Sequence, residues 1–154
     1  MPTRQISKDG WPIMRVDFWL KGQPIGKGRP RFTRQGRAYT PAKTKDYEHR
    51  LAAAASDAMQ DLGYEPATGK CQVHILAQFE IPKSWSKKRR EAATRGEVLP
   101  GRPDIDNVVK IALDAVNGVV FEDDAQVWRI NATKRYGDPL MLVSVEWDDG
   151  GKDE

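Results

Sequence analysis

Residues 104–116 read DIDNVVKIALDAV, and this stretch decides the fold. Its apolar residues recur three and four positions apart, which predicts a helix over 105–116 with one buried face. Gly118 follows as the expected helix stop. The rest of the chain has to supply the layer on which this apolar stripe packs.

Carboxylates bracket the predicted helix. Asp106 is the expected N-cap, Asp104 lies two residues earlier behind a proline, and Asp123 and Asp124 follow the helix. One aspartate at a helix start is explained by capping, but an Asp-x-Asp pair costs electrostatic energy unless a cation is present. Lys110 lies one turn after Asp106 on the polar face. The pattern is typical of a metal site. The alternative explanation is that Asp106 caps the helix, Lys110 forms a surface ion pair, and Asp123 and Asp124 start a turn.

Alternating apolar residues predict a sheet in the remainder of the chain. The predicted strands cover residues 13–20, 71–81, 126–134 and 140–147, and residues 137–139 are expected to join the last two as a hairpin. Further helices are expected over 44–62, ending at Gly63, and over 84–93, where a serine caps a short basic helix. These elements predict an α+β fold with one mixed β-sheet and two to three helices packed on it.

Length and composition predict one domain covering residues 1–154, with a formal net charge of +3. The single Cys71 cannot form an intramolecular disulfide, and the N-terminus lacks the apolar run of a signal peptide, so we expect a cytoplasmic protein. No apolar run is long enough to cross a bilayer, and no membrane partner is expected. His49 and His74 lack the spacing of a zinc site. Residues 148–154 are expected to form an acidic, solvated tail.

Residues 22–41 form a predicted basic loop, rich in Gly, Pro and Arg, with a short hairpin near Gln35-Gly36. Arginine forks bind phosphates, and Phe32 and Tyr39 add rings that can stack on bases. A solvated flexible segment is the alternative, but the charge pattern favours contact with nucleic acid. The basic residues expected to contact DNA, in this loop and just before the first aspartate, are Lys27, Arg29, Arg31, Arg34, Arg37 and Arg102.

Several segments together resemble one known family. Residues 103–110, 113–118 and 123–127 are similar to the signature of the RusA family of Holliday junction resolvases, which bacteriophages and prophages frequently carry. Residues 27–32 and 39–41 resemble the start of phage-type members. The best-studied kind of member has an arginine where this chain has Pro103, and Arg102 is the candidate to take its place.

The resemblance implies a RusA-like homodimer that binds four-way DNA junctions and nicks two strands of like polarity with Mg²⁺, or with Mn²⁺ as a substitute. It implies catalytic roles for Asp104, Asp106, Lys110 and Asp124, with the three aspartates as metal ligands and Asp123 as a further candidate ligand. Carboxylate-bound Mg²⁺ suits phosphodiester hydrolysis, and a nearby lysine can stabilise charge on the phosphate. Two alternatives stay open: a nuclease acting mainly on forks or flaps, and a DNA-binding protein that does not cleave.

Overall fold

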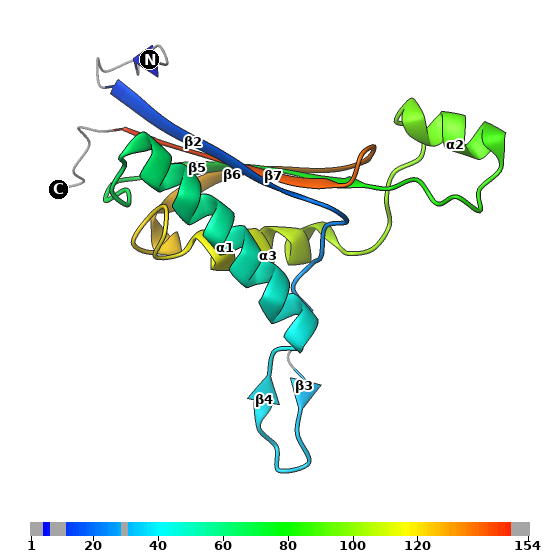
Figure 1. Ribbon diagram of the computed structural model, residues 1–154, viewed down its shortest axis with the longest axis horizontal. Coiled ribbons are helices and arrows are strands. Elements are labelled where there is room, and N and C mark those ends of the chain that lie inside the picture. The colour runs from blue at the N-terminus through cyan, green and yellow to red at the C-terminus, as the bar shows by residue number, and fades with distance from the viewer. Residues whose placement is uncertain (1–4, 7–11, 29–30, 149–154) are drawn as a thin grey trace.

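The computed structural model describes residues 5–6, 12–28 and 31–148. The chain forms a five-stranded sheet in the order β1-β2-β7-β5-β6, with the long helices on one face (Figure 1). In chain order the elements are β1 (Gln5–Ile6), β2 (Pro12–Lys21), β3 (Arg31–Phe32), β4 (Ala38–Tyr39), α1 (Ala42–Leu62), β5 (Cys71–Phe79), α2 (Lys87–Thr94), α3 (Ile105–Val116), η1 (Asp124–Gln126), β6 (Val127–Tyr136) and β7 (Leu140–Asp148). The prediction of a single α+β domain with a mixed sheet is confirmed.

The core lies between the sheet and two helices, α1 and α3. Along β5, every second residue from Cys71 to Phe79 is buried, because a strand turns successive side chains to opposite faces. Helix α1 buries Tyr47, Leu51 and Met59, and α3 packs beside it. Helix α2 stands away from this core, beyond one end of the sheet (Figure 1).

The predicted hairpin between the last two strands is wrong. Strand β6 pairs with β5 in parallel, whereas β7 pairs antiparallel with both β5 and β2, so that β5 lies between β6 and β7. The connecting residues cross the end of β5: Gly137 N donates to Phe79 O over 2.9 Å, and Gln78 Nε2 donates to Asp138 O over 2.7 Å. Such a crossing spans two strand spacings, about 10 Å, which three extended residues can cover.

The ends of several elements differ from the predicted ones by a few residues. Helix α1 begins at Ala42 and ends at Leu62, and the C-cap Gly63 has the left-handed φ of 68° that favours glycine. Helix α2 begins at Lys87, three residues after the predicted start, and a serine does cap it, because Ser86 Oγ accepts from Arg89 N over 3.2 Å. Strand β1 had no signal in the sequence. Asp148 ends β7, and residues 149–154 of the predicted tail lie outside the described residues.

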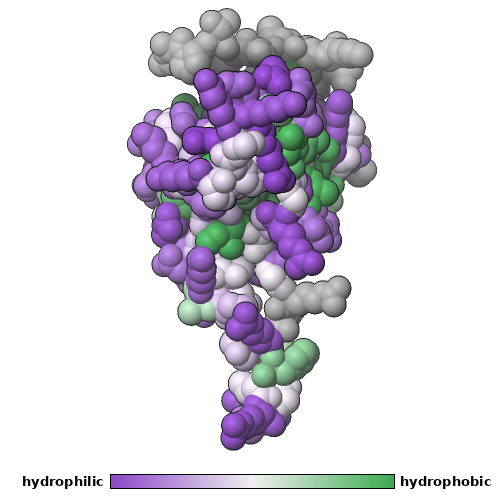
Figure 2. Space-filling model, turned by 90° about the vertical axis from the view of Figure 1, so that its right-hand side faces the viewer, coloured by the Kyte–Doolittle hydropathy of each residue, from purple (hydrophilic) through white to green (hydrophobic). Residues whose placement is uncertain are grey.

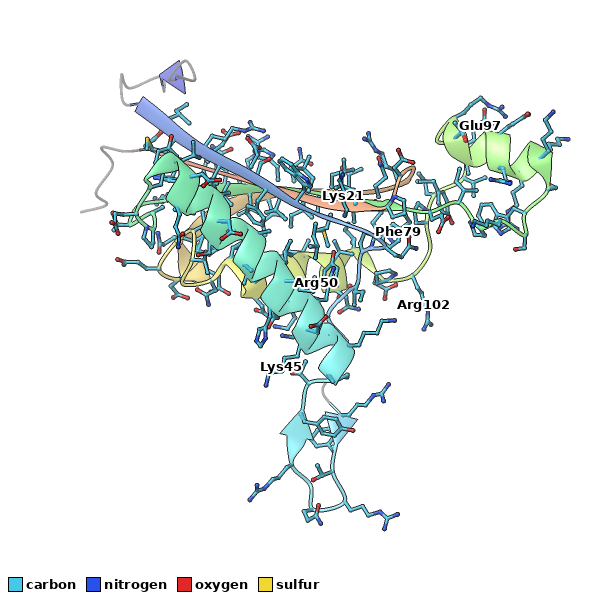
Figure 3. All side chains as sticks on the ribbon, in the orientation of Figure 1. Lys21, Lys45, Arg50, Phe79, Glu97 and Arg102 are labelled. Atoms are coloured by element: carbon cyan, nitrogen blue, oxygen red, sulfur yellow. The ribbon has the colours of Figure 1, made fainter. Side chains whose placement is uncertain are left out.

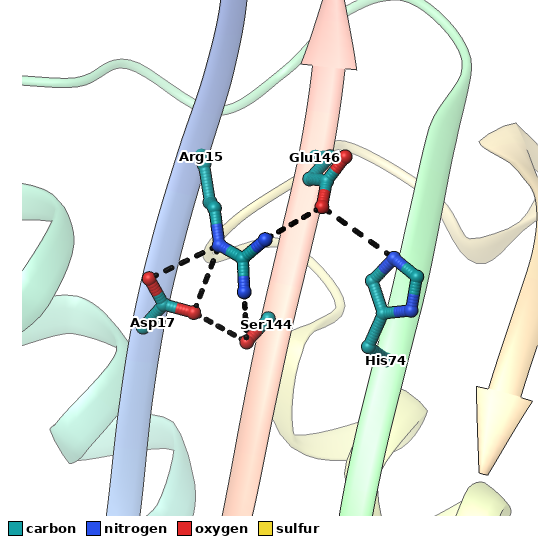
Figure 4. A network of polar contacts seen from close by, with 5 residues as sticks. All are labelled: Arg15, Asp17, His74, Ser144 and Glu146. Carbon is teal, nitrogen blue, oxygen red and sulfur yellow. Dashed lines mark hydrogen bonds and ion pairs between the residues drawn. The ribbon is translucent and has the colours of Figure 1, made fainter. Parts of the chain in front are cut away.

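The face of the sheet opposite the helices carries a polar network across three strands (Figure 4). Arg15 on β2 contacts Asp17 at 3.1 Å and Glu146 on β7 at 2.8 Å. Asp17 also accepts from Ser144 Oγ, and His74 Nε2 on β5 lies 3.5 Å from Glu146. These contacts fix the register of β2, β7 and β5. Within the described ranges, no helix is both long and apolar enough to cross a membrane.

Candidate active site and nucleic-acid interface

Helix α3 positions the first part of the candidate site. Its buried side is apolar and includes Val108, Ile111, Ala112, Ala115 and Val116. This anchoring turns the opposite side outward, where Asp106 and Lys110 are exposed one turn apart. The apolar period in the sequence therefore determines which polar side chains reach solvent.

The N-cap of α3 is Asp104, and the prediction that Asp106 is the cap is wrong. Asp104 O accepts from Asn107 N and Val108 N, so the first turn begins at Ile105 and contains Asp106. The Asp104 side chain makes no capping hydrogen bond. Capping therefore accounts for neither carboxylate, and both are exposed at the positive end of the helix dipole, which favours negative charge.

Lys134 on β6 holds the loop that leads to Asp104. Its Nζ donates to Pro103 O over 3.0 Å and also to Gly101 O. The sequence analysis did not single out this lysine. Lys134 lies on the same face of β6 as Ile130 and Ala132. A charged residue on an otherwise apolar strand face is the feature of the sequence that could have identified it.

The first part of the basic loop, at Gly26 and Lys27, packs closely on the start of α3. Lys27 N donates to Asn107 O over 2.9 Å. A Cβ added at Gly26 would lie 2.6 Å from Pro103 Cβ and 3.2 Å from Asn107 Cβ, so only glycine fits there without displacement. The loop before α3 is thus held by Lys134 from one strand and by Gly26 from another segment.

The Lys27 side chain forms ion pairs with both α1 and α3 and is largely shielded from solvent. Its Nζ lies 2.7 Å from Glu48 on α1 and 3.0 Å from Asp114 on α3, and its side chain is only 16% exposed. Burial alone would lower the pKa of Lys27, but the two carboxylates outweigh burial and raise the pKa above its ordinary value. Lys27 can meet a phosphate, as the sequence predicts, only if these pairs break.

Asp114 also faces Lys110, whose Nζ lies 3.7 Å away from the same carboxylate oxygen that contacts Lys27. The two contacts are unequal, because the Lys27 side chain is 16% exposed and that of Lys110 is 62% exposed. An exposed pair at this distance is weak, typically ~0 to 1 kcal/mol. Lys110 is therefore available to an incoming phosphate.

Asp123 and Asp124 are exposed and lie past the other end of α3. Gln126 fixes the turn that holds them. Its Nε2 donates to Ala67 O and Gly69 O, each over 2.8 Å, and its Oε1 accepts from Asp123 N over 2.9 Å. The sequence analysis did not identify this role of Gln126.

Two estimates show that Asp124 is far from Asp104 within one chain. Helix α3 has 12 residues, so at about 1.5 Å per residue its ends are about 18 Å apart. Along β6, the path from Val127, beside the turn, to Lys134, beside the Asp104 loop, is about 23 Å at about 3.3 Å per residue. In the described part of the chain, no three aspartate, glutamate, histidine or cysteine side chains form a metal-binding group.

The start of α3 has the chemistry of a partial Mg²⁺ site. Magnesium is usually held by one or two carboxylates, while water and substrate phosphates complete the octahedron. Asp104 and Asp106 provide such oxygen ligands, and Asp104 lines a pocket of about 330 Å³ together with Arg102, Pro103 and Asn107. The ligand type therefore fits Mg²⁺.

The candidate nucleic-acid interface is the hairpin of β3 and β4, with its basic side chains Arg31, Arg34 and Arg37. The hairpin extends from the body as a narrow arm with a hydrophilic end (Figure 2). Its tip is closed by hydrogen bonds between Thr33 and Arg37, including Thr33 N to Arg37 O over 2.9 Å. All three arginines are exposed, and Phe32 is 70% exposed. The predicted short hairpin is confirmed, and its cations and ring are free to meet a ligand.

The sequence also predicts DNA contacts by Arg29 and Arg102. Arg29 falls outside the described residues. Arg102 is exposed in the loop before α3 and points away from the body below the sheet (Figure 3). Because Arg102 lines the same pocket as Asp104, it can bind a phosphate next to the carboxylates.

Residues 21–146 match the protein family described as "Endodeoxyribonuclease RusA". The chain is also similar to a Bacillus subtilis (strain 168) protein described as "Uncharacterized protein YqaN". The two are 34% identical over 137 residues, which cover 84% of this chain and 94% of the relative. The family match spans both the start of α3 and the turn that holds Asp124.

Proposed function

Because the chain belongs to the RusA endodeoxyribonuclease family, we propose that it resolves four-way DNA junctions by Mg²⁺-dependent, paired nicks. The observation that best supports this function is the start of α3. There, Asp104 and Asp106 are both exposed, and the Asp104 side chain makes no capping hydrogen bond and lines a pocket of about 330 Å³. Lys110 lies one turn after Asp106. A protein that only bound DNA would gain nothing from acids placed where the phosphate backbone has to approach.

In this proposal, Asp104 and Asp106 hold the divalent cation. When bound, the cation supplies an activated water and offsets charge on the leaving 3′-oxygen. Lys110 donates to a non-bridging oxygen of the scissile phosphate and stabilises the charge that develops on it. Arg102 binds a neighbouring phosphate and so orients the backbone over the pocket.

The basic arm explains how branched DNA would be held. The arm lies in a segment, Gly22 to Lys45, that contains no acidic residue, so its exposed arginines attract the phosphate backbone. A four-way junction has two-fold symmetry, and paired nicks require two sites, so the proposed active form is a homodimer. Contacts to phosphates carry little sequence information, and we therefore expect recognition of shape.

The test compares the wild type with Asp106→Asn, using Asp61→Asn on the exposed side of α1 as the matched control. Wild type and Asp61→Asn should nick a synthetic four-way junction symmetrically with Mg²⁺ or Mn²⁺. Asp106→Asn should bind the junction and lose at least about 100-fold in nicking rate, since it loses a metal ligand. Equal cleavage by Asp106→Asn, or no cleavage by wild type with either ion, contradicts the proposal. Faster cleavage of forks or flaps than of junctions would identify those as the substrate.

A further inference from the structure

We propose that the basic helix α2 is a second DNA-binding element, which holds the phosphate backbone of one duplex of a branched DNA while the β3–β4 arm holds a different duplex. This inference rests on the proposed function, because it takes branched DNA as the ligand. Residues 83–95 contain six basic side chains and one acidic one, Glu91. Such a surplus attracts polyanions, and duplex DNA carries one negative charge per about 1.7 Å of its axis.

The positive charges of α2 are not neutralised within the chain. In the part of the chain that the structure describes, the exposed side chains of Lys87, Lys88 and Arg90 form no ion pair. Arg95, just after the same helix, instead pairs with Glu97 at 3.0 Å. The three unpaired cations are therefore available to phosphates.

The position of these cations opposes the stability of the helix. Lys87 and Lys88 lie in the first turn of α2, which contains no acidic residue. Positive charge is unfavourable at this end of a helix, where the dipole favours anions. Lys87 and Arg90 are also three positions apart, so that two like charges are neighbours on the helix surface. A helix that only covered the surface would be more stable with acids here, whereas bound phosphates relieve both kinds of repulsion.

Helix α2 is nevertheless fixed to the body of the protein. The ring of Trp85, just before the helix, packs edge-on against Tyr136 at the end of β6, with centroids 5.4 Å apart. The Arg89 guanidinium lies over the Trp85 ring, 3.7 Å from its centroid, and Ala93 is buried. The cations of α2 are thus held in place, which lowers the entropy cost of binding relative to that of a flexible tail.

Helix α2 begins beside the loop that carries the first carboxylate. Tyr136, on which Trp85 packs, lies two residues after Lys134 on β6, so their side chains share a strand face and are about 7 Å apart along the strand. Lys134 holds Pro103, the residue before Asp104. A duplex bound by α2 is therefore close to the proposed metal ligands.

Helix α2 and the β3–β4 arm leave the body in different directions (Figure 1). The base of the arm is also fixed at the start of α3, because Lys27 N donates to Asn107 O over 2.9 Å. The proposed cleavage site thus lies near the bases of two diverging basic elements. A straight duplex that follows one element leaves the other without phosphates, whereas a four-way junction supplies duplexes in several directions. This arrangement therefore fits branched DNA better than linear DNA.

Binding at different salt concentrations tests the charge contacts. The triple variant Lys87→Gln, Lys88→Gln, Arg90→Gln is compared with Arg95→Gln, the matched control beside the same helix, both in an Asp106→Asn background. We expect the triple variant to bind a four-way junction more weakly, with a slope of log affinity against log salt smaller in magnitude by about 3. Arg95→Gln should keep the slope of the background protein. The melting temperature of the triple variant should not fall, because the removed cations oppose the helix dipole.

Cross-linking tests whether the two elements hold different duplexes. Cys71 is the single cysteine, and burial raises its pKa to about 11, so Lys88→Cys adds a thiol that reacts selectively near pH 8. Gln35→Cys does the same at the exposed tip of the arm. Each thiol is labelled with a photoactivated cross-linker in the Asp106→Asn background. We expect the labels on α2 and on the arm to attach to different duplexes of the junction.

The outcomes separate this inference from the proposed function. An unchanged salt slope in the triple variant of α2 overturns the inference, and so does attachment of both labels to the same duplex. None of these measurements needs cleavage. A wild-type protein that shows the expected slopes and cross-links but never nicks a junction refutes the proposed function and still supports DNA binding by α2.

Discussion

Lys134 Nζ on the edge strand β6 lies 3.0 Å from Pro103 O, and this contact ties the carboxylate loop to the sheet. The residue after Pro103 is Asp104, so a small movement of the loop displaces a proposed metal ligand directly. Lys134 has no proposed contact with DNA or metal, but through this hydrogen bond it affects the position of Asp104.

Replacing this ammonium group should reduce turnover more than binding. We expect Lys134→Met to lower kcat by about 10- to 100-fold, because a ligand misplaced by about 1 Å is costly, while KM changes little. Lys134→Arg keeps the charge and the donors, and it should recover part of the lost kcat. Steady-state kinetics on a four-way junction checks both variants. A loss confined to KM would contradict the role of Lys134 in positioning the loop.

Gly26 provides an independent test of the same loop. A methyl group at this position would lie 2.6 Å from Pro103 Cβ, so Gly26→Ala has to push the loop or the start of α3 aside. The matched control is Gly28→Ala, because a Cβ at Gly28 meets nothing within 4 Å. We expect Gly26→Ala to lose nicking rate and about 1–3 kcal/mol of stability, and Gly28→Ala to retain both. Chemical unfolding and nicking assays measure the two effects, and equal behaviour of the variants would refute the close packing.

Lys27→Met tests the ion pairs that join α1 and α3. Removing the ammonium leaves the Glu48 and Asp114 carboxylates facing each other in a partly buried place, so we expect a loss of about 2 kcal/mol in the free energy of unfolding at pH 7. The folded-state pKa of Lys27 is raised, so its stabilising effect is fully present below the unfolded pKa of lysine and is lost as pH rises through the folded pKa.

The matched control for Lys27 is Lys110→Met, which removes an exposed partner of the same Asp114 at 3.7 Å. This change should alter stability by less than about 0.5 kcal/mol, although it should reduce nicking. Urea unfolding of both variants, repeated from pH 7 to pH 11, gives the comparison. An equal loss of stability in the two variants would show that the ion pairs of Lys27 with Glu48 and Asp114 stabilise the fold no more than the exposed pair of Lys110 does.

The sequence predicted those features that depend on local chemistry. The apolar period of α3, the alternation of β5 and the glycine at the end of α1 each follow from side chains within one segment, and the structure confirms them. The N-cap was misplaced by two residues because Asp104 and Asp106 are equally good caps on composition alone.

Features that depend on distant pairing could not be read from the chain. The position of β5 between β6 and β7 is decided by sheet packing, and a three-residue connection permits either adjacent or separated strands. The acids that the resemblance groups together lie before and after α3: Asp104 and Asp106 are at its start, and Asp124 follows its end. Lys134 and Gln126 act on segments more than 30 positions away, beyond any local period.

The arm of β3 and β4 gives the sharpest prediction on DNA binding. Arg31, Arg34 and Arg37 are all exposed on a hairpin whose tip is held by its own hydrogen bonds, so removing their charges should leave the fold intact. Removing one cation that binds a phosphate should reduce the slope of log affinity against log salt by about 1. We therefore expect the triple variant Arg31→Gln, Arg34→Gln, Arg37→Gln to bind a four-way junction more weakly at low salt. Its slope of log affinity against log salt should be smaller in magnitude by about 3.

The matched control for the arm is Arg95→Gln, because Arg95 is exposed near the end of α2 and pairs with Glu97 at 3.0 Å. Its slope should equal that of the wild type, since its charge is already engaged and lies away from the arm. Fluorescence anisotropy across a salt series measures all three proteins, using Asp106→Asn as the background so that no cleavage intervenes. An unchanged slope in the triple variant would show that the arm binds no phosphate, and would leave Arg102 and the basic helix α2 as the candidates for DNA binding.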